Sequence, residues 1–462
     1  MEVQDWAREE FGSADLGDAR RVERLIRVAG AAAARPSGYV SASASALSNA
    51  ERTGAYRLVN NREVDVEEVS RAARDACIRR SHGLPFVFVA EDGSSVSVSD
   101  GPGWRETGVV GTHTQGSRGF IVMNAIVLAP DGTPLGVGSQ KWWSRDEPVD
   151  TPAHKRKPED KETRHWVDVA EAVARDFSAA DAPRPWFQFD RGGDAWFVLD
   201  EAVRRGWWLT VRSSSDRRLD VDADAEVRTV RGALEATPPL TTMKVDVAGG
   251  HGRAPRVAEV TLHATPVTIR LTNDRTEKRW PVRMWAVWAH ELRPPPGSEP
   301  LDWVLLTTRP VESAEDAVLT VQGYRLRWRV EEFHRTWKSA GCDIELSQLS
   351  TAHAVQVWAS ILASVAVRIL RMTYLSRTAP ETPATVEFSE DEIDAAYLMN
   401  KKKRDRKTMP SIAEVTWLIA KGGGHAPGRR GVAPGAEVIA RGLERHAVWV
   451  EAIQTVRREG EM

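Results

Sequence analysis

The stretch YRLRWRVEEFHRTWK (residues 324–338) carries the strongest indication of fold and chemistry in this chain. Tyr324, Arg327, Glu331 and Lys338 stand at offsets 0, 3, 7 and 14. At roughly 100° per residue these positions fall on one narrow helical stripe, where a core stripe would carry Leu, Ile or Val. A carboxylate among cations on one helix face predicts a site for a metal ion and phosphate. Glu332 points roughly 100° away, so Glu331 is the better ligand candidate.

The spacing resembles the Tyr-(2)-Arg-(3)-Glu-(6)-Lys signature of bacterial cut-and-paste transposases of the insertion-sequence-four family. The wider string WRVEEFHRTWKSAG is most similar to the Tn-five branch of that family. The resemblance implies that Glu331 is the third carboxylate of an Asp-Asp-Glu metal site. The alternative from the residues alone is an amphipathic helix with a surface ladder of ion pairs.

Composition limits the class of protein. A chain of 462 residues with 42% hydrophobic and 28% charged residues is ordinary for a globular protein of several domains. The net charge of −2 does not indicate nucleic acid, so any DNA contact must come from local basic surfaces. Two cysteines, Cys77 and Cys342, have no metal-type spacing and suit a reducing cytosol. No apolar run approaches the ~18 residues of a membrane span, so we expect a cytoplasmic protein with no membrane partner.

The order of helical and strand patterns predicts three domains. Residues 1–80 have helical spacing, and strands then alternate with helices over 81–375, which favours an α/β core with a mixed sheet. Antiparallel strands are predicted within a β-rich insertion at about 214–300. Residues 376–462 are predicted as a helical C-terminal domain for dimerisation and DNA contact. The resemblance implies that the core is ribonuclease-H-like.

A basic cluster lies near the start of the first long predicted helix. Arg20, Arg21 and Arg24 there could hold phosphates, or they could form a solvated helix face. This segment also resembles the end-binding domain of Tn-five-like transposases. The resemblance implies that these arginines, together with Arg57 of the GAYR motif, contact transposon-end DNA.

Two aspartates follow apolar runs that read as buried strands. Asp92 ends LPFVFVAED and Asp190 ends WFQFD, and polar residues at strand ends are where α/β folds place their sites. Each is weak alone, because Asp also caps turns. With Glu331 they form a trio in the order expected of a ribonuclease-H-like Asp-Asp-Glu fold. The motifs Glu91 to Ser95 and Asp190 to Asp194 resemble that family as well.

This trio suits phosphodiester transfer. Two Mg²⁺ ions about 3.5–4 Å apart can activate a nucleophilic oxygen, stabilise the leaving oxygen and neutralise charge at phosphorus. Mg²⁺ prefers carboxylate oxygen, so Asp92, Asp190 and Glu331 are the predicted catalytic and metal-binding residues. Mn²⁺ is expected to substitute, and no small-molecule cofactor is expected. The resemblance implies a first cut by water, a hairpin intermediate, and joining of the freed 3′-hydroxyl to target DNA.

Further roles follow from the same resemblance. Tyr324, Arg327 and Lys338 would contact phosphates near the cleaved end. Trp303 would stack on a flipped base, and Arg212 would lie near the hairpin. The alternatives are a buried strand tryptophan and a surface ion-pair partner.

Other polar residues near these motifs receive structural interpretations. Asp194 is predicted to be a helix cap or a support for the site rather than a ligand. Gly192 departs from the Glu that relatives often carry there. His334 and Arg335 lie off the helix stripe and are assigned to structure or general DNA contact.

The predicted protein is therefore a bacterial, nucleoid-associated transposase that binds double-stranded DNA and forms a homodimer in a paired-end complex. Its final helix, with apolar Val438, Ile439, Leu443, Val448 and Val450, could form the dimer contact or pack on its own chain. Two other functions stay open: a catalytically idle DNA-binding regulator derived from a transposase, and a ribonuclease-H-like nuclease.

Overall fold

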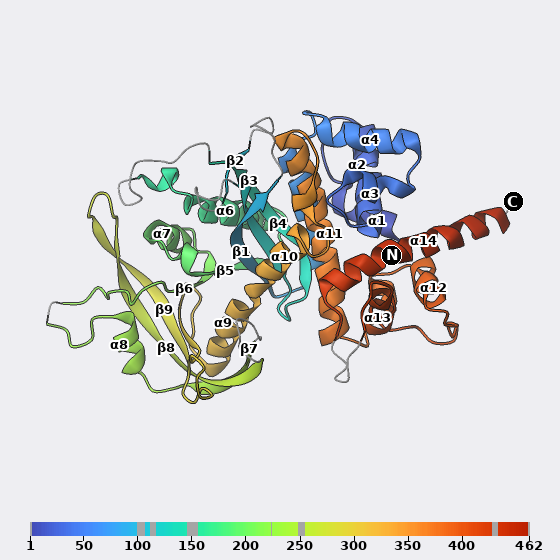
Figure 1. The fold of residues 1–462 in the computed structure, drawn as a ribbon. Coiled ribbons are helices and arrows are strands. Elements are labelled where there is room, and N and C mark those ends of the chain that lie inside the picture. The colour runs from blue at the N-terminus through green and yellow to red at the C-terminus, as the bar shows by residue number, and fades with distance from the viewer. Residues whose placement is uncertain are drawn as a thin grey trace. The chain divides into compact units, whose positions relative to one another are not determined.

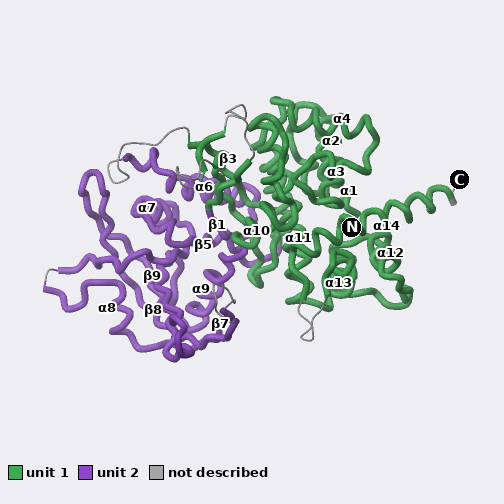
Figure 2. Tube along the Cα trace, in the orientation of Figure 1, with its two compact units in different colours: residues 1–82, 93–148, 330–462 green, residues 83–92, 149–329 purple. Residues whose placement is uncertain are grey.

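The structure, a computed structural model, describes residues 2–98, 107–110, 117–145, 156–222, 224–247, 255–426 and 433–460. The chain forms two compact units (Figure 2). Unit 1 comprises Met1–His82, Gly93–Pro148 and Val330–Met462, and unit 2 comprises Gly83–Asp92 and Val149–Arg329. The three domains expected from the sequence stay a prediction.

A mixed sheet forms the centre of unit 2 (Figure 1). Strands β1 (Phe86–Ser97), β5 (Arg184–Phe189) and β6 (Trp208–Arg212) are parallel neighbours. The strands that follow are antiparallel, in the order β10 (Asp302–Thr307), β9 (Arg279–Glu291), β8 (Arg256–Thr272) and β7 (Thr241–Val247). The predicted β-rich insertion is therefore confirmed as antiparallel strands, and they extend the same sheet.

Helices pack on the strands of unit 2. Helices α6 (Arg164–Ala179) and α9 (Ala314–Leu326) contact β5, α7 (Trp196–Arg204) contacts α6, and α8 (Val230–Glu235) contacts β8. Helix α9 approaches β1 so closely that a Cβ atom on Gly323 would lie 2.4 Å from Cε1 of Phe88. Only glycine permits this approach without movement of the phenyl ring, so Gly323 sets the depth at which α9 lies.

Unit 1 contains the antiparallel hairpin β3 (Arg118–Leu128) and β4 (Pro134–Trp143), with the short β2 (Gly108–Val109) paired to β3. The second half of β1 runs beside β3, where the Val98 amide donates to the Arg118 carbonyl at 3.1 Å. Helix α10 (Trp328–Lys338) packs on this hairpin, because buried Asn124 of β3 contacts His334 at 3.0 Å and Gln140 of β4 at 2.8 Å. His334 thus has a structural contact, as one of its two predicted roles requires.

The predicted end of the first strand was wrong. Asp92 does not follow β1 but lies inside it, since the strand continues to Ser97. The parallel partner β5 is paired only as far as Ala90↔Gln188. Beyond that point β1 continues beside β3, and this tertiary pairing overrides the turn-like sequence DGSS.

The signature stretch is not one continuous helix. Helix α9 ends at Leu326 and α10 begins at Trp328, with Arg327 between them in right-handed helical conformation, φ −51° and ψ −34°. The Arg327 amide donates to the Tyr324 carbonyl at 3.2 Å, which is the tighter bond of a 3₁₀ turn. The single predicted stripe is therefore carried by two successive helices.

The N-terminal segment is helical, as predicted. It consists of α1 (Val3–Phe11), α2 (Ala19–Ala34), α3 (Val40–Ser43), α4 (Asn49–Asn60) and α5 (Val66–Ser81). The Asp18 side chain caps α2 by accepting from the Arg20 amide, and Ser48 and Glu51 form a capping box at the start of α4. These local signals explain why both helices begin where the sequence indicates.

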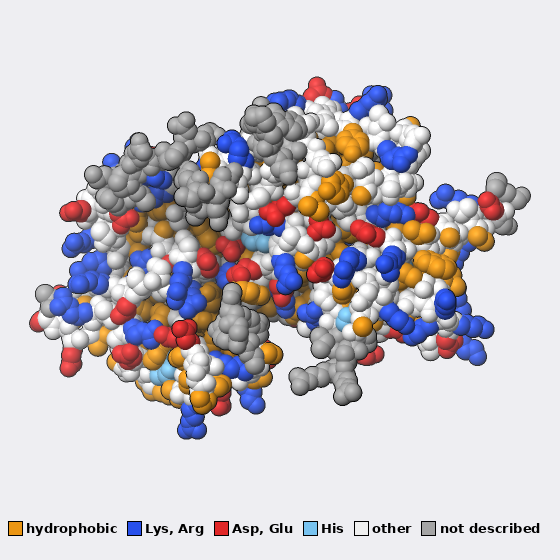
Figure 3. Space-filling view, viewed as in Figure 1, with side chains coloured by type: hydrophobic (Ala, Val, Ile, Leu, Met, Phe, Trp, Pro, Cys, Tyr) orange, Lys and Arg blue, Asp and Glu red, His pale blue; other side chains and the backbone are white. Residues whose placement is uncertain are grey.

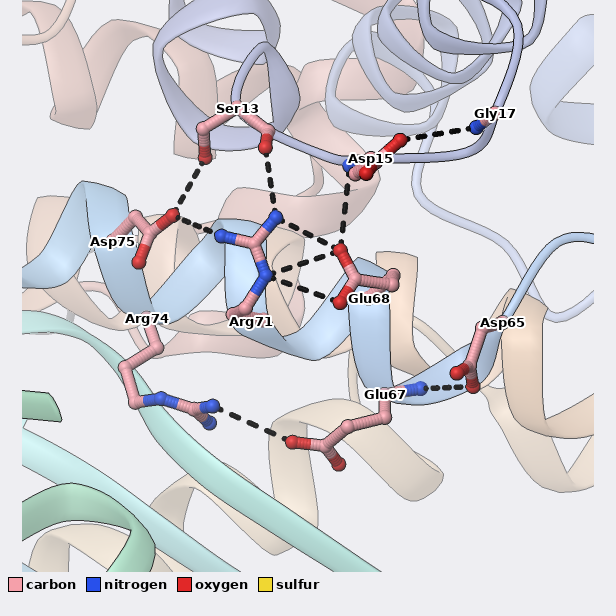
Figure 4. A network of polar contacts seen from close by, with 9 residues as sticks. All are labelled: Ser13, Asp15, Gly17, Asp65, Glu67, Glu68, Arg71, Arg74 and Asp75. Atoms are coloured by element: carbon pink, nitrogen blue, oxygen red, sulfur yellow. Dashed lines mark hydrogen bonds and ion pairs between the residues drawn. The ribbon is translucent and has the colours of Figure 1, made fainter. Parts of the chain in front are cut away.

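Polar contacts tie the loop before α2 to α5 (Figure 4). Arg71 donates to Glu68 at 2.8 Å, to Asp75 at 2.7 Å and to the Ser13 carbonyl at 3.0 Å. The hydrogen bonds from Arg71 lower the pKa of Glu68. The start of α2, which carries the arginine cluster, is held in place by this network.

Helix α11 (Ala352–Thr378) is the core helix of unit 1. It contacts β4 as well as α2, α4, α5 and α13. Within the described residues it is the one helix long and apolar enough to cross a membrane, and 89% of its apolar window is buried. The sequence expectation that no such run exists is corrected, and the helix is apolar because elements of its own unit surround it.

The C-terminal part consists of α12 (Glu390–Met399), α13 (Ile412–Gly422) and α14 (Ala436–Gly460), which pack on one another. In the first half of α14 one face is buried, with Ile439 0% and Leu443 3% exposed, whereas Val448 in the second half is 57% exposed. The His446 imidazole is buried beside α12, where its Nε2–H donates to the Glu392 carbonyl at 2.6 Å. Burial, and then the charge of Arg368, lower the pKa of His446 to about 4.

We predict that the buried imidazole makes stability pH-dependent. In the unfolded chain a histidine binds a proton as the pH falls through about 6.5, whereas folded His446 does so only near pH 4. Between these values protonation favours the unfolded state, so stability falls as the pH falls, by up to roughly 3 kcal/mol. Urea unfolding of wild type and His446→Gln from neutral pH to pH 4 measures this, because glutamine keeps the donor without the titration. Parallel pH profiles for the two proteins would contradict the prediction, and exposed His82→Gln is the control.

Candidate active site

Asp92 lies in β1, and Asp190 directly follows β5, the neighbouring parallel strand of unit 2. Ala90 of β1 pairs with Gln188 of β5, and each aspartate lies two residues further along its own strand direction. Residues two apart point to the same face, and adjacent strands lie about 4.8 Å apart. Both aspartates therefore lie just beyond the last register pair of β1 with β5, and their joint role in one site stays a prediction.

The Asp190 carboxylate is oriented by the turn that follows β5. Its Oδ1 accepts from the Gly192 amide at 2.6 Å and caps the short 3₁₀ helix Arg191–Gly193. A Cβ atom on Gly192 would lie 2.9 Å from the same oxygen. The glycine that departs from the family pattern thus leaves room for the carboxylate.

Arg327 lies beside Asp92, at 3.7 Å between Nη1 and Oδ2. The guanidinium also lies over the Tyr324 ring, 5.9 Å from its centroid. Arg327 is 9% and Tyr324 6% exposed, and Tyr324 belongs to the apolar core between α9 and the antiparallel strands. The structure therefore brings the signature arginine to the first aspartate but buries the tyrosine, which can offer a phosphate little surface.

Glu331 belongs to unit 1, on the face of α10 that packs on strands. His334, three residues on, contacts Asn124 of β3, and Lys338 donates to Ser94 of β1 at 3.4 Å. Residues three and seven apart lie on one helix face, so half-buried Glu331 points toward the same strands. Lys338 also lies 3.5 Å from Glu345, whose carboxylate accepts from the Ser97 amide.

A third carboxyl, Glu91, lies next to Asp92 but on the opposite face of β1. It is fully buried, and neither of its oxygens has a hydrogen-bond partner in the part of the chain that the structure describes. Burial, followed by the charges of Asp92 and Asp168, raises the pKa of Glu91 well above its usual value. Sequence reasoning treated Glu91 only as a member of a motif and did not predict that burial would favour its protonated form.

Asp194 anchors a loop, and its oxygens are already occupied. Its side chain accepts from the Ser214 amide at 2.7 Å and forms an ion pair with Arg217 at 2.6 Å. Both partners lie in the loop after β6, so Asp194 fixes that loop to the turn after β5. This arrangement agrees with a supporting role and gives the residue no free ligand oxygen at the site.

Trp303 and Arg212 lie at the junction of the parallel and antiparallel strands. Half-buried Trp303 of β10 packs edge-on against Tyr324, with ring centroids 5.4 Å apart. Arg212, at the end of β6, donates to the Asp302 carbonyl at 3.2 Å. The two side chains are therefore neighbours of the same β10 segment, but their roles toward DNA stay a prediction.

The predicted N-terminal arginines line a pocket of about 430 Å³ in unit 1, with Asp18, Arg20, Arg21, Arg24, Arg57, Leu58 and Asn61 as its walls. Arg20 forms an ion pair with Asp18, which lowers the pKa of Asp18 to about 2. Arg21 is paired with Glu63. Arg24 and Arg57 have no ion pair among the described residues, so these two cations are available to an anion.

Gly54 of the GAYR motif explains how Arg24 and Arg57 come together. A Cβ atom on Gly54 would lie 3.0 Å from Nε of Arg24. The absence of a side chain lets α4 approach α2 at the point where Arg24 leaves it. The motif thus shapes the pocket in addition to supplying Arg57.

The donor set fits a hard divalent cation. Asp92 and Asp190 supply paired carboxylate oxygens of the kind that Mg²⁺ and Mn²⁺ prefer. Within the described residues no three His, Cys, Asp or Glu side chains gather into a metal-binding group. Asp92 and Asp190 belong to unit 2 and Glu331 to unit 1, and their joint binding of a metal ion stays a prediction.

Three families match successive parts of the chain. The family described as transposase DNA-binding matches residues 3–64, which contain the arginine pocket. The transposase DDE domain matches residues 226–368, which contain Glu331 but neither aspartate. The transposase Tn5 dimerisation domain matches residues 364–462.

These matches, on a mixed α/β sheet with helical ends, define a DDE transposase with a ribonuclease-H-like core, as predicted. This class of enzyme acts on DNA and generally uses divalent metal ions. The chain belongs to the Tn5-type DDE transposases, because the DNA-binding, DDE and Tn5 dimerisation families follow one another along it.

Proposed function

We propose that this transposase excises an insertion sequence by cutting both DNA strands at its ends and then joins the ends to a target duplex. The observation that carries the proposal is that Asp92 of β1 and Asp190, directly after the parallel β5, each lie two residues beyond the Ala90–Gln188 pair, with Arg327 beside Asp92. Glu331, on the strand-facing side of α10, would complete the trio. We place the protein with the nucleoid of the bacterial cytoplasm, where its DNA substrate lies.

The carboxylates would hold two divalent ions, Mg²⁺ or Mn²⁺, which when bound supply charge neutralisation at phosphorus and lower the pKa of water. The chain's own residues would align the strand for in-line attack. Arg327 would bind the phosphate next to Asp92, since a guanidinium can contact two phosphate oxygens at once. Lys338 would act as a point charge on the neighbouring phosphate.

The proposed sequence of steps uses one site repeatedly. Water attacks phosphorus and the 3′ oxygen leaves as a hydroxyl. That hydroxyl attacks phosphorus in the opposite strand and displaces the 3′ oxygen of the flanking DNA, which closes a hairpin. A second water attacks the hairpin phosphorus and displaces the 3′ oxygen of the transposon end. The freed 3′-hydroxyl then attacks a phosphodiester of target DNA, whose 3′ oxygen leaves. Trp303 would stack on the base that leaves the helix at the hairpin bend, with Arg212 near the bent strand.

Loss of any one carboxylate should abolish cleavage. We expect Asp92→Ala, Asp190→Ala and Glu331→Ala to lower the nicking rate by more than roughly 100-fold, because even loss of a residue that supports a metal ligand costs 10- to 100-fold. A labelled duplex that carries the ends of the encoding element, incubated with Mg²⁺ or Mn²⁺ and with EDTA as the metal-free control, measures nicks and hairpins.

The matched control is Glu332→Ala, which removes the neighbouring acid and should keep cleavage. Cleavage retained by any of the three carboxylate variants would remove that residue from the site. End binding by wild type without metal-dependent cutting would favour an idle regulator, and robust cutting of branched DNA without joined product would favour a ribonuclease-H-like nuclease.

The arginine pocket is proposed to bind the phosphates of transposon-end DNA. Arg24 and Arg57 matter most, because Arg20 and Arg21 already have acidic partners. We expect Arg24→Ala or Arg57→Ala to weaken end binding roughly tenfold at about 0.1 M salt, the effect of about one phosphate contact. Fluorescence anisotropy on an end duplex measures this. Arg27→Ala removes an arginine of the same helix that is paired with Glu51, and an equal loss there would contradict the assignment.

The dimer contact is proposed to use the second half of α14. Dimer formation is supported by the family match over residues 364–462, and three apolar side chains on this part of the helix are exposed: Val448 57%, Trp449 42% and Val456 69%. The first half packs on its own chain, which is one of the two alternatives raised by the sequence, and we assign the other, the dimer contact, to the second half.

Polar replacement of this surface should separate the two subunits. We expect Trp449→Ser with Val456→Ser to convert a two-protein, two-end complex into a one-to-one complex while end binding by one subunit is kept. Light scattering of the protein–DNA complex after size exclusion measures the stoichiometry. Val257→Ser, at a valine of β8 that is 62% exposed, is the control. A paired complex that survives the double substitution would place the dimer contact elsewhere.

A further inference from the structure

The segment KKKRDRK (residues 401–407) has no part in the site or in the arginine pocket. It forms the loop between α12 and α13 in unit 1, and Asp405 is its only acid. Figure 3 shows Lys and Arg side chains gathered beside α12 and this loop. Because the whole chain has a net charge of −2, this concentration of positive charge is local.

The arginines of the loop hold it in place. Arg404 pairs with Glu390 at 2.6 Å and with Asp394 at 3.0 Å, and Arg406 pairs with Asp394 at 2.6 Å. Asp394 is 8% exposed and also lies 3.3 Å from Arg457 of α14. The acids at the base of the loop are therefore occupied by guanidinium groups from the loop and from α14.

The positive charges of the loop lysines are not balanced by nearby acids among the described residues. Lys401, Lys402, Lys403 and Lys407 are exposed, and their ammonium groups form no ion pair or hydrogen bond within the part of the chain that the structure describes. Lys401 has a left-handed backbone with φ +56°, a strained conformation for a residue with a side chain. The Lys401 and Lys402 amides donate to the Leu398 and Tyr397 carbonyls, so the reversal that presents the lysines is tied to the end of α12.

We propose that Lys401, Lys402, Lys403 and Lys407 form a second DNA-contact surface that binds the phosphates of a duplex without regard to sequence. Ammonium groups on flexible stems suit a closely spaced line of phosphates, and they release counterions when they bind. The anchored arginines restrict the loop, so less freedom is lost on binding than in a mobile tail. This proposal rests on the proposed function, because a transposase must hold both end and target duplexes.

The surface is separate from the arginine pocket within unit 1. Helix α14 contacts α12 through Arg457 and contacts Arg35, at the end of α2, through Glu451. The lysine loop thus lies on the α12 side of α14, whereas the pocket is lined mainly by residues of α2 and α4. Figure 1 shows α2 and α4 on the opposite side of α14 from α12. Substitutions in the lysine loop can therefore be tested for DNA binding without altering the arginine pocket, and the reverse also holds.

The test is the salt dependence of DNA binding by the full-length protein. The test variant combines Lys402→Ala, Lys403→Ala and Lys407→Ala. On a random-sequence duplex we expect the plot of log affinity against log salt to become shallower, with the magnitude of its slope smaller by about 3, at about 0.9 for each lost phosphate contact. At about 0.1 M salt we expect binding at least tenfold weaker. Lys401 is kept because of its backbone conformation. The three lysines replaced by arginine should restore the slope.

A control variant with the same change in charge and a test of folding make the salt-dependence result decisive. Lys157→Ala with Lys244→Ala and Lys278→Ala removes the same charge from exposed lysines elsewhere, and we expect it to leave the slope nearly unchanged. An unchanged slope in the loop variant, or an equal fall in this control, would overturn the proposal. Thermal unfolding checks that all variants are folded.

Separate reactions distinguish whether the lysine surface contacts target DNA or the DNA that flanks the transposon end. With ends cut beforehand, a loss of joining to plasmid at unchanged end binding supports contact with target DNA. A loss on duplexes that extend beyond the end supports contact with flanking DNA. Cleavage of end DNA by the wild type is measured in parallel. If the wild type cuts ends but the loop variant keeps the wild-type salt slope, the lysine surface is refuted and the proposed function stands. If the wild type neither binds nor cuts DNA, the proposed function is refuted.

Discussion

The parallel pairing of β1 with β5 is the constraint on which the candidate site depends. Ala90 lies opposite Gln188, so the strands reach their acids at the same level although 98 residues separate Asp92 from Asp190 in the chain. A shift of one residue in this register would turn one carboxylate to the opposite face. Pairing of buried strands, built from residues such as Val87, Val89 and Phe187, therefore determines where these two acids lie.

The position of Arg327 depends on a second close contact. Gly323 lets α9 lie against Phe88 of β1, and the helix ends three residues later, before Arg327. The guanidinium then lies beside Asp92 and over Tyr324. Packing of an apolar strand residue against a glycine thus places a guanidinium beside Asp92, and burial raises the pKa of Glu91 on the other face of the strand.

Elsewhere in the described part of the chain some cations form ion pairs that stabilise the fold, whereas others have no acidic partner there and are available to bind an anion. In α2, Arg20 and Arg21 are paired with acids, whereas Arg24 and Arg57 line the pocket without partners among the described residues. In the α12–α13 loop, Arg404 and Arg406 are paired with Glu390 and Asp394, whereas the lysines are exposed. In both places arginines paired with nearby acids hold the backbone, and neighbouring cations without such partners are available to bind anions.

The sequence by itself determined the elements and the order of the acids. Helical spacing predicted the N-terminal and C-terminal helices, and apolar runs predicted β1, β5 and the antiparallel strands β7 to β9, because these signals act within a few residues. The tertiary structure alone decided that β1 continues past Asp92, that the signature stretch divides at Arg327, that Tyr324 is buried and which arginines are paired. These outcomes depend on partners far away in the chain, such as Glu63 for Arg21 and β3 for the end of β1. No local pattern encodes them, since the energy of a strand extension or an ion pair depends on what packs beside it.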